Sequence, residues 1–133
     1  MNGLGAAKKS GRWNPKGVPL VYCSESRAMC VLEVIANSTS KHFPKMRMVT
    51  IEFPNEVAEM TGDLSDNWAD ETAGASSRKI GADFISEKKH LAMRVPSSLV
   101  PGDFNIVINP LHPSISKAQI VDAVDFKFGK RLI

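Results

Sequence analysis

A short apolar run, residues 29–36, restricts the fold of this chain more than any other feature. It reads Met-Cys-Val-Leu-Glu-Val-Ile-Ala, and its one charged member is Glu33. The run is much shorter than the roughly 20 apolar residues that a membrane-spanning helix needs. Its helical spacing, with Ser24 or Ser26 available as a cap, predicts a short helix. Because this helix is apolar on nearly all sides, we expect it to be buried.

Glu33 is the residue that determines whether this helix has a structural or a functional role. A carboxylate is costly to bury unless it is paired, hydrogen-bonded or protonated. The sequence leaves two alternatives: Glu33 is half of an internal ion pair, or it is a functional acid that faces a cleft. Composition alone favours an ion pair with Arg12, because structural ion pairs perturb the titration of acidic groups just as functional sites do.

The composition is that of an ordinary globular protein. The chain has 133 residues, 43% hydrophobic and 23% charged, so we expect one domain over residues 1–133. The net charge of +3 comes from scattered basic residues, which predicts no direct binding of nucleic acid. Cys23 and Cys30 lack partners at metal-ligand spacing, so no metal site is expected. The sequence shows neither a signal peptide nor a membrane span, which predicts a cytoplasmic protein.

Turn residues and hydrophobic alternation predict more strands than helices. Residues 1–10 are expected to be a loose lead-in, and residues 11–17 a loop rich in turn residues. Residues 55–75 are expected to be a loop with one helical turn near 56–60. A second helix, capped by Ser76 or Ser77, should extend to about residue 89. Strands are expected at residues 18–23, 46–53, 90–95, 104–108 and 120–128. These elements predict an α+β fold with a bent, mostly antiparallel sheet, against which the helix of Glu33 packs.

Four residues have the chemistry of a ligand site. Arg12, in a glycine-bounded loop, can bind a phosphate or carboxylate through two hydrogen bonds. Tyr22, near a strand end, can stack its ring on a flat ligand. Glu33 can accept hydrogen bonds from a sugar or stabilise an oxocarbenium-like transition state. Ser97, in a loop flanked by prolines, can add a hydrogen bond, so together the four suit a nucleotide.

Structural roles for the same residues stay open. Tyr22 can be a core residue with a satisfied hydroxyl, and Trp13 can be a loop anchor that buries one face of its ring. Ser97, next to a proline, can be a turn residue. On residue types and spacing alone, structural roles for these residues are therefore more common than roles in an enzyme site.

The order of several short motifs resembles the RES-domain family of toxins. The first group consists of Gly11-Arg12-Trp13-Asn14-Pro15-Lys16-Gly17, Val21-Tyr22 with Ser24 and Ser26, and Leu32-Glu33-Val34. The second group consists of residues 91–101 and of Asn105 through Asn109-Pro110-Leu111-His112-Pro113. Each piece alone is weak, but the combination is specific, because it extends over about residues 10–130 in the family's order.

The resemblance implies a fold similar to that of ADP-ribosyltransferase toxins, with NAD+ bound in a cleft as substrate and no metal. It implies catalytic roles for Arg12, Tyr22 and Glu33. It implies NAD+ contacts from Gly11, Arg12, Trp13, Tyr22 and Ser97. The implied reaction cleaves the nicotinamide–ribose bond with water or phosphate as acceptor and depletes cellular NAD+. The alternatives are transfer of an ADP-ribosyl or phosphoribosyl group to a protein, and an inactive remnant that only binds a partner.

The resemblance also implies a protein partner. RES toxins belong to type II toxin–antitoxin pairs, so we expect an antitoxin with an Xre-like domain that covers the active cleft. The assembly would be a toxin–antitoxin hetero-oligomer, or a homodimer of the toxin. Family members usually carry a strand before the Gly-Arg-Trp motif. Residues 1–10 lack a strand pattern, so either the start codon is assigned too late or that strand is absent and a sheet edge is unprotected.

Overall fold

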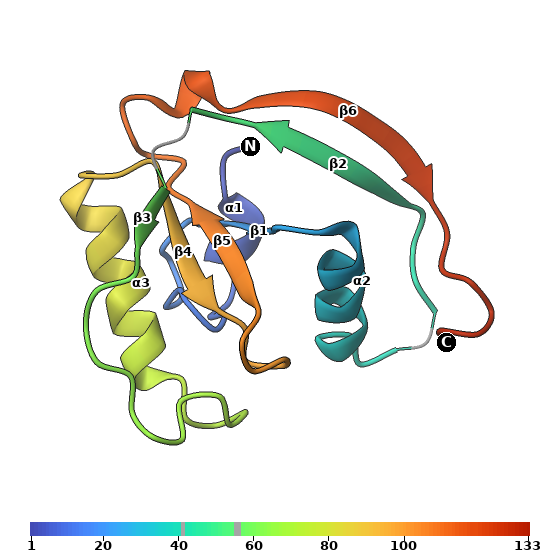
Figure 1. The fold of residues 1–133 in the computed structure, drawn as a ribbon, viewed down its shortest axis with the longest axis horizontal. Coiled ribbons are helices and arrows are strands. Elements are labelled where there is room, and N and C mark those ends of the chain that lie inside the picture. The colour runs from blue at the N-terminus through green and yellow to red at the C-terminus, as the bar shows by residue number, and fades with distance from the viewer. Residues whose placement is uncertain (41, 55–56) are drawn as a thin grey trace.

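The computed structural model describes residues 1–40, 42–54 and 57–133. Its larger sheet has the strand order β1 (Val21–Ser24), β5 (Phe104–Ile108), β4 (Ala92–Pro96) and β3 (Val57–Glu59) (Figure 1). Strand β3 runs parallel to β4, and the other pairs are antiparallel. A separate antiparallel ribbon joins β2 (Met46–Glu52) to β6 (Gln119–Phe126). The helices are α1 (Leu4–Ala7), α2 (Arg27–Ala36) and α3 (Ala75–Glu87), with a 3-10 turn η1 (Ile115–Lys117).

The predicted α+β class and the mostly antiparallel pairing are confirmed. Two details differ from the prediction. The strands expected at 46–53 and 120–128 pair with each other in the ribbon instead of closing one sheet. The helical turn expected near 56–60 is strand β3, because pairing with buried β4 overrides the local preference of this segment. Residues 55 and 56 of that prediction lie outside the described residues.

The lead-in at residues 1–10 is more ordered than the sequence predicts. It contains the short helix α1, and the buried side chain of Asn14 donates a hydrogen bond to the carbonyl oxygen of Ala6 at 2.9 Å. A further bond joins the Gly17 N–H to the carbonyl oxygen of Ala7 at 2.8 Å. These contacts come from residues up to ten positions away, so local composition did not reveal them. Strand β1 is the first strand in the described part of the chain.

The two faces of the larger sheet pack against different parts of the chain. Side chains of β4 and β5 on one face form a core with Trp13, Leu20 and the α3 residues Phe84 and Ile85. The opposite face packs against η1 and the end of β2. Helix α3 therefore holds the loop of Trp13 against one face of the sheet.

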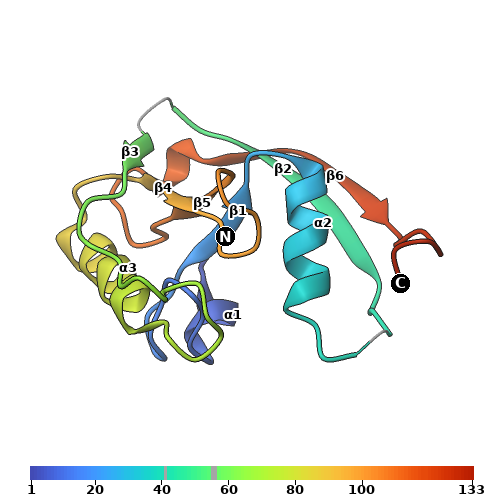
Figure 2. The ribbon, with the colours of Figure 1, turned by 60° about the horizontal axis from the view of Figure 1, so that its bottom comes forward.

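Helix α2 begins as predicted, but it is not buried. The hydroxyl oxygen of Ser26 accepts a hydrogen bond from the Met29 N–H at 3.1 Å and caps the helix. Met29 is the buried residue of α2, whereas Leu32 is 39% exposed. The helix lies beside β1 and along the ribbon in both views, so its outer side faces solvent (Figures 1 and 2). None of the helices in the described ranges is long and apolar enough to cross a membrane.

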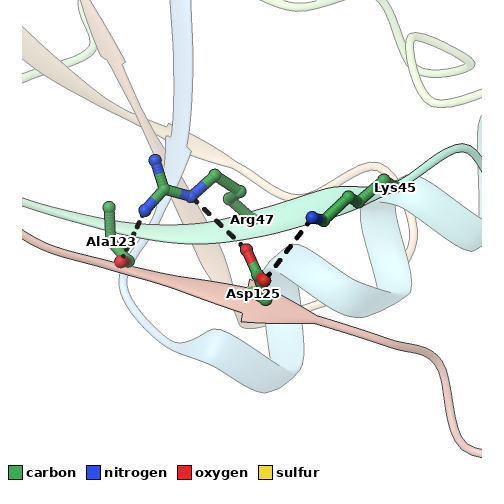
Figure 3. A network of polar contacts seen from close by, with 4 residues as sticks. All are labelled: Lys45, Arg47, Ala123 and Asp125. Carbon is green, nitrogen blue, oxygen red and sulfur yellow. Dashed lines mark hydrogen bonds and ion pairs between the residues drawn. The ribbon is translucent and has the colours of Figure 1, made fainter.

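Charged side chains on the ribbon contribute little to its stability. Figure 3 shows Arg47 of β2 donating to the carbonyl oxygen of Ala123 at 2.9 Å, with Asp125 3.7 Å from Arg47 and 3.8 Å from Lys45. All three charged side chains are at least 60% exposed, and exposed ion pairs are worth about 0–1 kcal/mol. Backbone pairing and apolar cross-strand neighbours such as Met46 and Phe126 hold the ribbon together.

A glycine permits the close contact between α3 and the Trp13 loop. A Cβ atom on Gly81 would overlap the carbonyl group of Trp13. Gly81 is buried in the middle of α3, where glycine normally costs about 1 kcal/mol relative to alanine. The close approach of two backbones outweighs that cost and explains a glycine at this position.

We therefore predict that Gly81→Ala destabilises the fold although it improves helix propensity. Overpacking of this kind costs about 1–3 kcal/mol, more than the propensity gain. Thermal and urea unfolding should show the loss. Gly5→Ala in α1 is the control, since a Cβ at Gly5 meets nothing within 4 Å. Equal stability of the two variants would contradict the close-packing argument.

Candidate active site

The loop that carries Arg12 is held by the hydroxyl of Tyr22. That hydroxyl accepts a hydrogen bond from the Trp13 N–H at 3.1 Å and donates one to the side-chain oxygen of Asn14. Within the loop, the Gly11 N–H donates to the carbonyl oxygen of Asn14 at 2.8 Å. A Cβ on Gly11 would lie 2.6 Å from both the Tyr22 hydroxyl and the Asn14 side-chain oxygen. Strand β1 thus fixes the loop through one phenol, and Gly11 leaves the space for it.

Arg12 is half-buried and is oriented by main-chain groups. Its Nη1 donates to the carbonyl oxygens of Trp68 and Asp70, at 2.6 and 2.9 Å. Its own carbonyl oxygen accepts a hydrogen bond from the buried Ser77 hydroxyl at 2.5 Å. Nε and Nη2 of Arg12 make no hydrogen bond within the described ranges, so these donors can reach a phosphate or carboxylate.

Glu33 is held by an amide, and no cation of the described residues forms an ion pair with it. Its Oε1 accepts a hydrogen bond from Nδ2 of Asn105 at 2.7 Å. Oδ1 of the same amide accepts one from the Ser24 hydroxyl at 2.7 Å. The other carboxylate oxygen, Oε2, has a longer contact of 3.4 Å with the exposed side chain of Asn37. The predicted ion pair between Arg12 and Glu33 is therefore wrong, because each side chain binds other groups.

One face of the larger sheet carries both halves of this arrangement. Side chains two positions apart in a strand point to the same face, so Tyr22 and Ser24 share a face about 7 Å apart along β1. Asn105 lies opposite Ser24 in β5 and points to that face as well. The loop of Arg12, bonded to Tyr22, and the carboxylate of Glu33, reached through Ser24 and Asn105, therefore lie over neighbouring positions of one surface.

Trp13 and Ser97 occupy structural positions. Trp13 is 3% exposed and packs against Trp68 with ring centroids 5.6 Å apart, as a loop anchor does. Ser97 is 4% exposed, and its hydroxyl oxygen accepts hydrogen bonds from the N–H groups of Leu99 and Val100 at 3.1 Å, as in a turn. Neither side chain presents exposed surface to a ligand in this conformation.

Tyr22 combines an accessible ring with a sheltered hydroxyl. The residue is 44% exposed, which leaves ring surface for stacking and excludes a core position. Desolvation of the hydroxyl raises the pKa of Tyr22 from 10.0 to about 12, against smaller opposing effects that include its contacts with Trp13 and Asn14. The hydroxyl is therefore protonated at neutral pH and can donate to Asn14.

Cys23 and the acidic side chains of the described ranges form no second candidate site. Burial, reinforced by the neighbouring Cys30, raises the pKa of the Cys23 thiol from 9.0 to about 11, so this thiol is unreactive at neutral pH. No group of three or more His, Cys, Asp or Glu side chains in the described ranges is placed to hold a metal ion.

Two hollows in the molecule lie away from these residues. One, of about 500 Å³, lies between β3 and α3, and the other, of about 420 Å³, lies between the end of α2 and residues 131–133. Neither is lined by Arg12, Tyr22 or Glu33. The candidate site, over the end of β1, therefore lies outside both of these hollows.

Sequence reasoning missed the two asparagines that organise the site. The sequence predicts only a turn at Asn14, yet this residue is fully buried and joins Tyr22 to α1. Asn105 stands out in the sequence only as part of a motif, yet it links Ser24 to Glu33. A signal for Asn105 was present, since an amide in the apolar strand Phe-Asn-Ile-Val-Ile needs a buried partner.

Known proteins are similar to this sequence over nearly its whole length. The RES domain family matches residues 1–129. A relative from Sphingobium sp. (strain YBL2), described as "Prs ADP-ribosylating toxin", is 39% identical over 100% of this chain and 86% of its own length. A relative from Yersinia enterocolitica, described as "Toxin Res", is 32% identical over 98% of this chain and 88% of its own length.

The fold has a close counterpart among solved structures. A chain of the M. tuberculosis MbcT-MbcA toxin-antitoxin complex superposes on 96% of this chain and 77% of its own length, with a TM-score of 0.77 at 21% identity. At that identity the likeness concerns the fold alone. The family match over residues 1–129 and the 39% identity to a relative of similar length show that this chain belongs to the RES domain family.

Proposed function

We propose that this chain is the toxin of a toxin–antitoxin pair and that it cleaves the nicotinamide–ribose bond of NAD+. The observation that carries the proposal is the Glu33 carboxylate, which is sheltered, hydrogen-bonded to Asn105 and unpaired with any cation of the described residues. A carboxylate in that state keeps its negative charge available to a ligand. The relatives described as toxins, one of them as ADP-ribosylating, support the same substrate.

The reaction needs what Glu33 can supply. The nicotinamide of NAD+ carries a positive charge, so it departs as a neutral base and takes the bonding electrons without protonation. Positive charge then develops on the ribose. Glu33, placed near the ribose hydroxyls, would stabilise that charge by electrostatics and hydrogen bonding. An oxygen of the acceptor, water or phosphate, forms the new bond to the ribose carbon and loses its proton to solvent.

Other site residues bind and orient the dinucleotide. The free donors of Arg12 suit the diphosphate, which would fix the scissile bond relative to Glu33. The exposed ring of Tyr22 can stack on a base. The backbone of Gly11 and Trp13 would border the diphosphate, whereas Ser97 would shape the loop that follows β4 without touching the ribose.

A protein partner and a cytoplasmic setting complete the proposal. The known chain of similar fold occurs in a toxin-antitoxin complex. We propose that an antitoxin covers the surface between Arg12 and Glu33 and blocks NAD+. In the cytoplasm, free toxin would draw on the NAD+ pool of its own cell, which explains the need for such a partner.

Glu33→Gln should lower the rate of nicotinamide release from NAD+ by about 10²–10³, the usual cost of removing one preorganised electrostatic contact. The amide is the same size and can still accept the hydrogen bond of Asn105, so the melting temperature should change little. Glu87→Gln, an exposed carboxylate in α3, is the matched control and should match the wild type. No release from the wild type, or equal release from Glu33→Gln, would refute the proposal.

A protein acceptor is the second candidate, since the 39% identical relative is described as an ADP-ribosylating toxin. The same departure of nicotinamide would precede transfer to a nucleophilic side chain. NAD+ labelled in its adenylate half distinguishes the two reactions in lysate. Transfer predicts label on a macromolecule in amounts equal to the nicotinamide released, and cleavage to water or phosphate predicts label only in small molecules. Glu33→Gln should abolish either pattern.

The Tyr22 hydroxyl gives a prediction that depends on pH. Because its pKa is higher in the fold than in the unfolded chain, the stability it contributes is complete below pH 10.0 and is lost as the pH rises towards about 12. Tyr22→Phe should therefore be less stable than the wild type at pH 8, and the difference should shrink between pH 10 and pH 12. Thermal unfolding across that range measures it.

Cys23 does not disturb this comparison, because its thiol titrates in both proteins. A stability difference that stays constant up to pH 12 would show that the hydroxyl does not anchor the loop. Tyr22→Phe should also slow nicotinamide release, since the loop of Arg12 loses its attachment to β1.

A further inference from the structure

The side chain of Asn105 is in contact with the candidate acid on one side and with β1 on the other. It projects from the second position of β5 and is half-buried. Its amide nitrogen lies 2.7 Å from Oε1 of Glu33, and its amide oxygen lies 2.7 Å from the Ser24 hydroxyl. Three elements, β1, β5 and α2, thus meet in one chain of two hydrogen bonds.

The direction of these hydrogen bonds follows from the chemistry of the groups. An ionised carboxylate only accepts, so the NH₂ group of Asn105 must face Glu33. The amide oxygen then points to Ser24, whose hydroxyl is free to donate to it. If the amide were reversed, its oxygen would face a carboxylate oxygen with no proton between them. Glu33 therefore selects the orientation in which Asn105 donates to it, and the Ser24 hydroxyl satisfies the amide oxygen in that orientation.

We propose that Asn105 is a positioning residue for Glu33, that the Ser24 hydroxyl holds the oxygen of its amide, and that Oε2 is the carboxylate oxygen left for the ribose. The assignment deepens the proposed function and rests on it. Oε1 is occupied at 2.7 Å, whereas among the described residues Oε2 has only the 3.4 Å contact with the exposed Asn37. A neutral donor fixes the direction of the carboxylate without cancelling its charge.

The surroundings of Asn105 make a charge substitution informative. Its partners across the sheet are Ser24 in β1 and Val95 in β4, neither of which carries a charge. From α2, the group that reaches it is Glu33. No ion pair within the described ranges involves Glu33. Within the described ranges, Glu33 is therefore the titratable group that is hydrogen-bonded to position 105, and the charged groups next along β1 and β4 are Glu25 and Arg94, which pair with each other at 2.9 Å.

Asn105→Asp tests the assignment with almost no change of shape. Two ionised carboxylates at hydrogen-bond distance repel each other unless they share a proton. At pH 8 we expect kcat for nicotinamide release to fall by about 10–100-fold, as when a group that orients a reactive side chain is lost, with little change in KM. The ratio of mutant to wild-type kcat should rise as the pH falls towards 5, because a shared proton restores the donor.

Gln119→Glu adds the same charge at an exposed position of β6 and is the control. Its pH profile should match the wild type. A loss in Asn105→Asp that does not vary with pH would overturn the assignment and leave Asn105 a packing role.

A double variant separates positioning from stability. Asn105→Asp combined with Glu33→Gln again pairs an amide with a carboxylate, with the roles exchanged. The melting temperature should recover towards the wild type, while nicotinamide release stays as low as in Glu33→Gln alone. Recovery of release in the double variant would overturn the inference, since the carboxylate would then act from either position.

A measurement without substrate keeps this inference apart from the proposed function. Carbon-13 NMR compares the pH dependence of the Glu33 carboxyl signal in Asn105→Asp and in the wild type, which should differ because a second carboxylate now faces Glu33. The same pH dependence in both proteins would overturn the contact on which the inference rests. Absence of nicotinamide release from the wild type would overturn the proposed function, whatever the NMR result.

Discussion

A neutral amide satisfies the carboxylate of Glu33, and the whole candidate site depends on this contact. A guanidinium in the place of Asn105 would satisfy the same oxygen but would also cancel its charge. The amide compensates the loss of water through a hydrogen bond and leaves the negative charge in place. Half-burial keeps the remaining desolvation cost modest. An acid can therefore be stable in this fold and still stabilise positive charge on a ligand.

The four residues of β1 connect the two halves of the site. Alternation along the strand points Tyr22 and Ser24 to the same face, one towards the Arg12 loop and the other towards Asn105. Helix α3 holds the same loop from the other side. There the Ser77 hydroxyl donates to the carbonyl oxygen of Arg12, and Gly81 lies against the backbone of Trp13. Groups held by regular elements keep their geometry better than groups on free loops. The main-chain contacts of Arg12 extend that rigidity to a charged side chain.

Local patterns predicted the elements, and long-range contacts decided how those elements meet. The strand at 104–108 and the Ser26-capped start of α2 follow from alternation and capping, which involve neighbours in sequence. The choice between an ion pair and a free acid at Glu33 depended on Asn105, 72 residues away. Arg12 likewise binds Trp68, 56 residues away. The catalytic roles of Arg12, Tyr22 and Glu33 stay predictions.

The exposure of α2 shows why an apolar pattern does not determine burial. Apolar residues around the whole helix are satisfied only if something covers each side, and here β1 and the ribbon cover part of it. The amide of Asn105 in β5 behaves in the opposite way, because a polar side chain in an apolar strand needs a hydrogen-bond partner from some other part of the chain. Apolar residues tolerate partial exposure at modest cost, whereas a buried amide does not tolerate a missing bond. The most specific information about this site therefore lay in its polar exceptions, Asn14 and Asn105, and not in its apolar run.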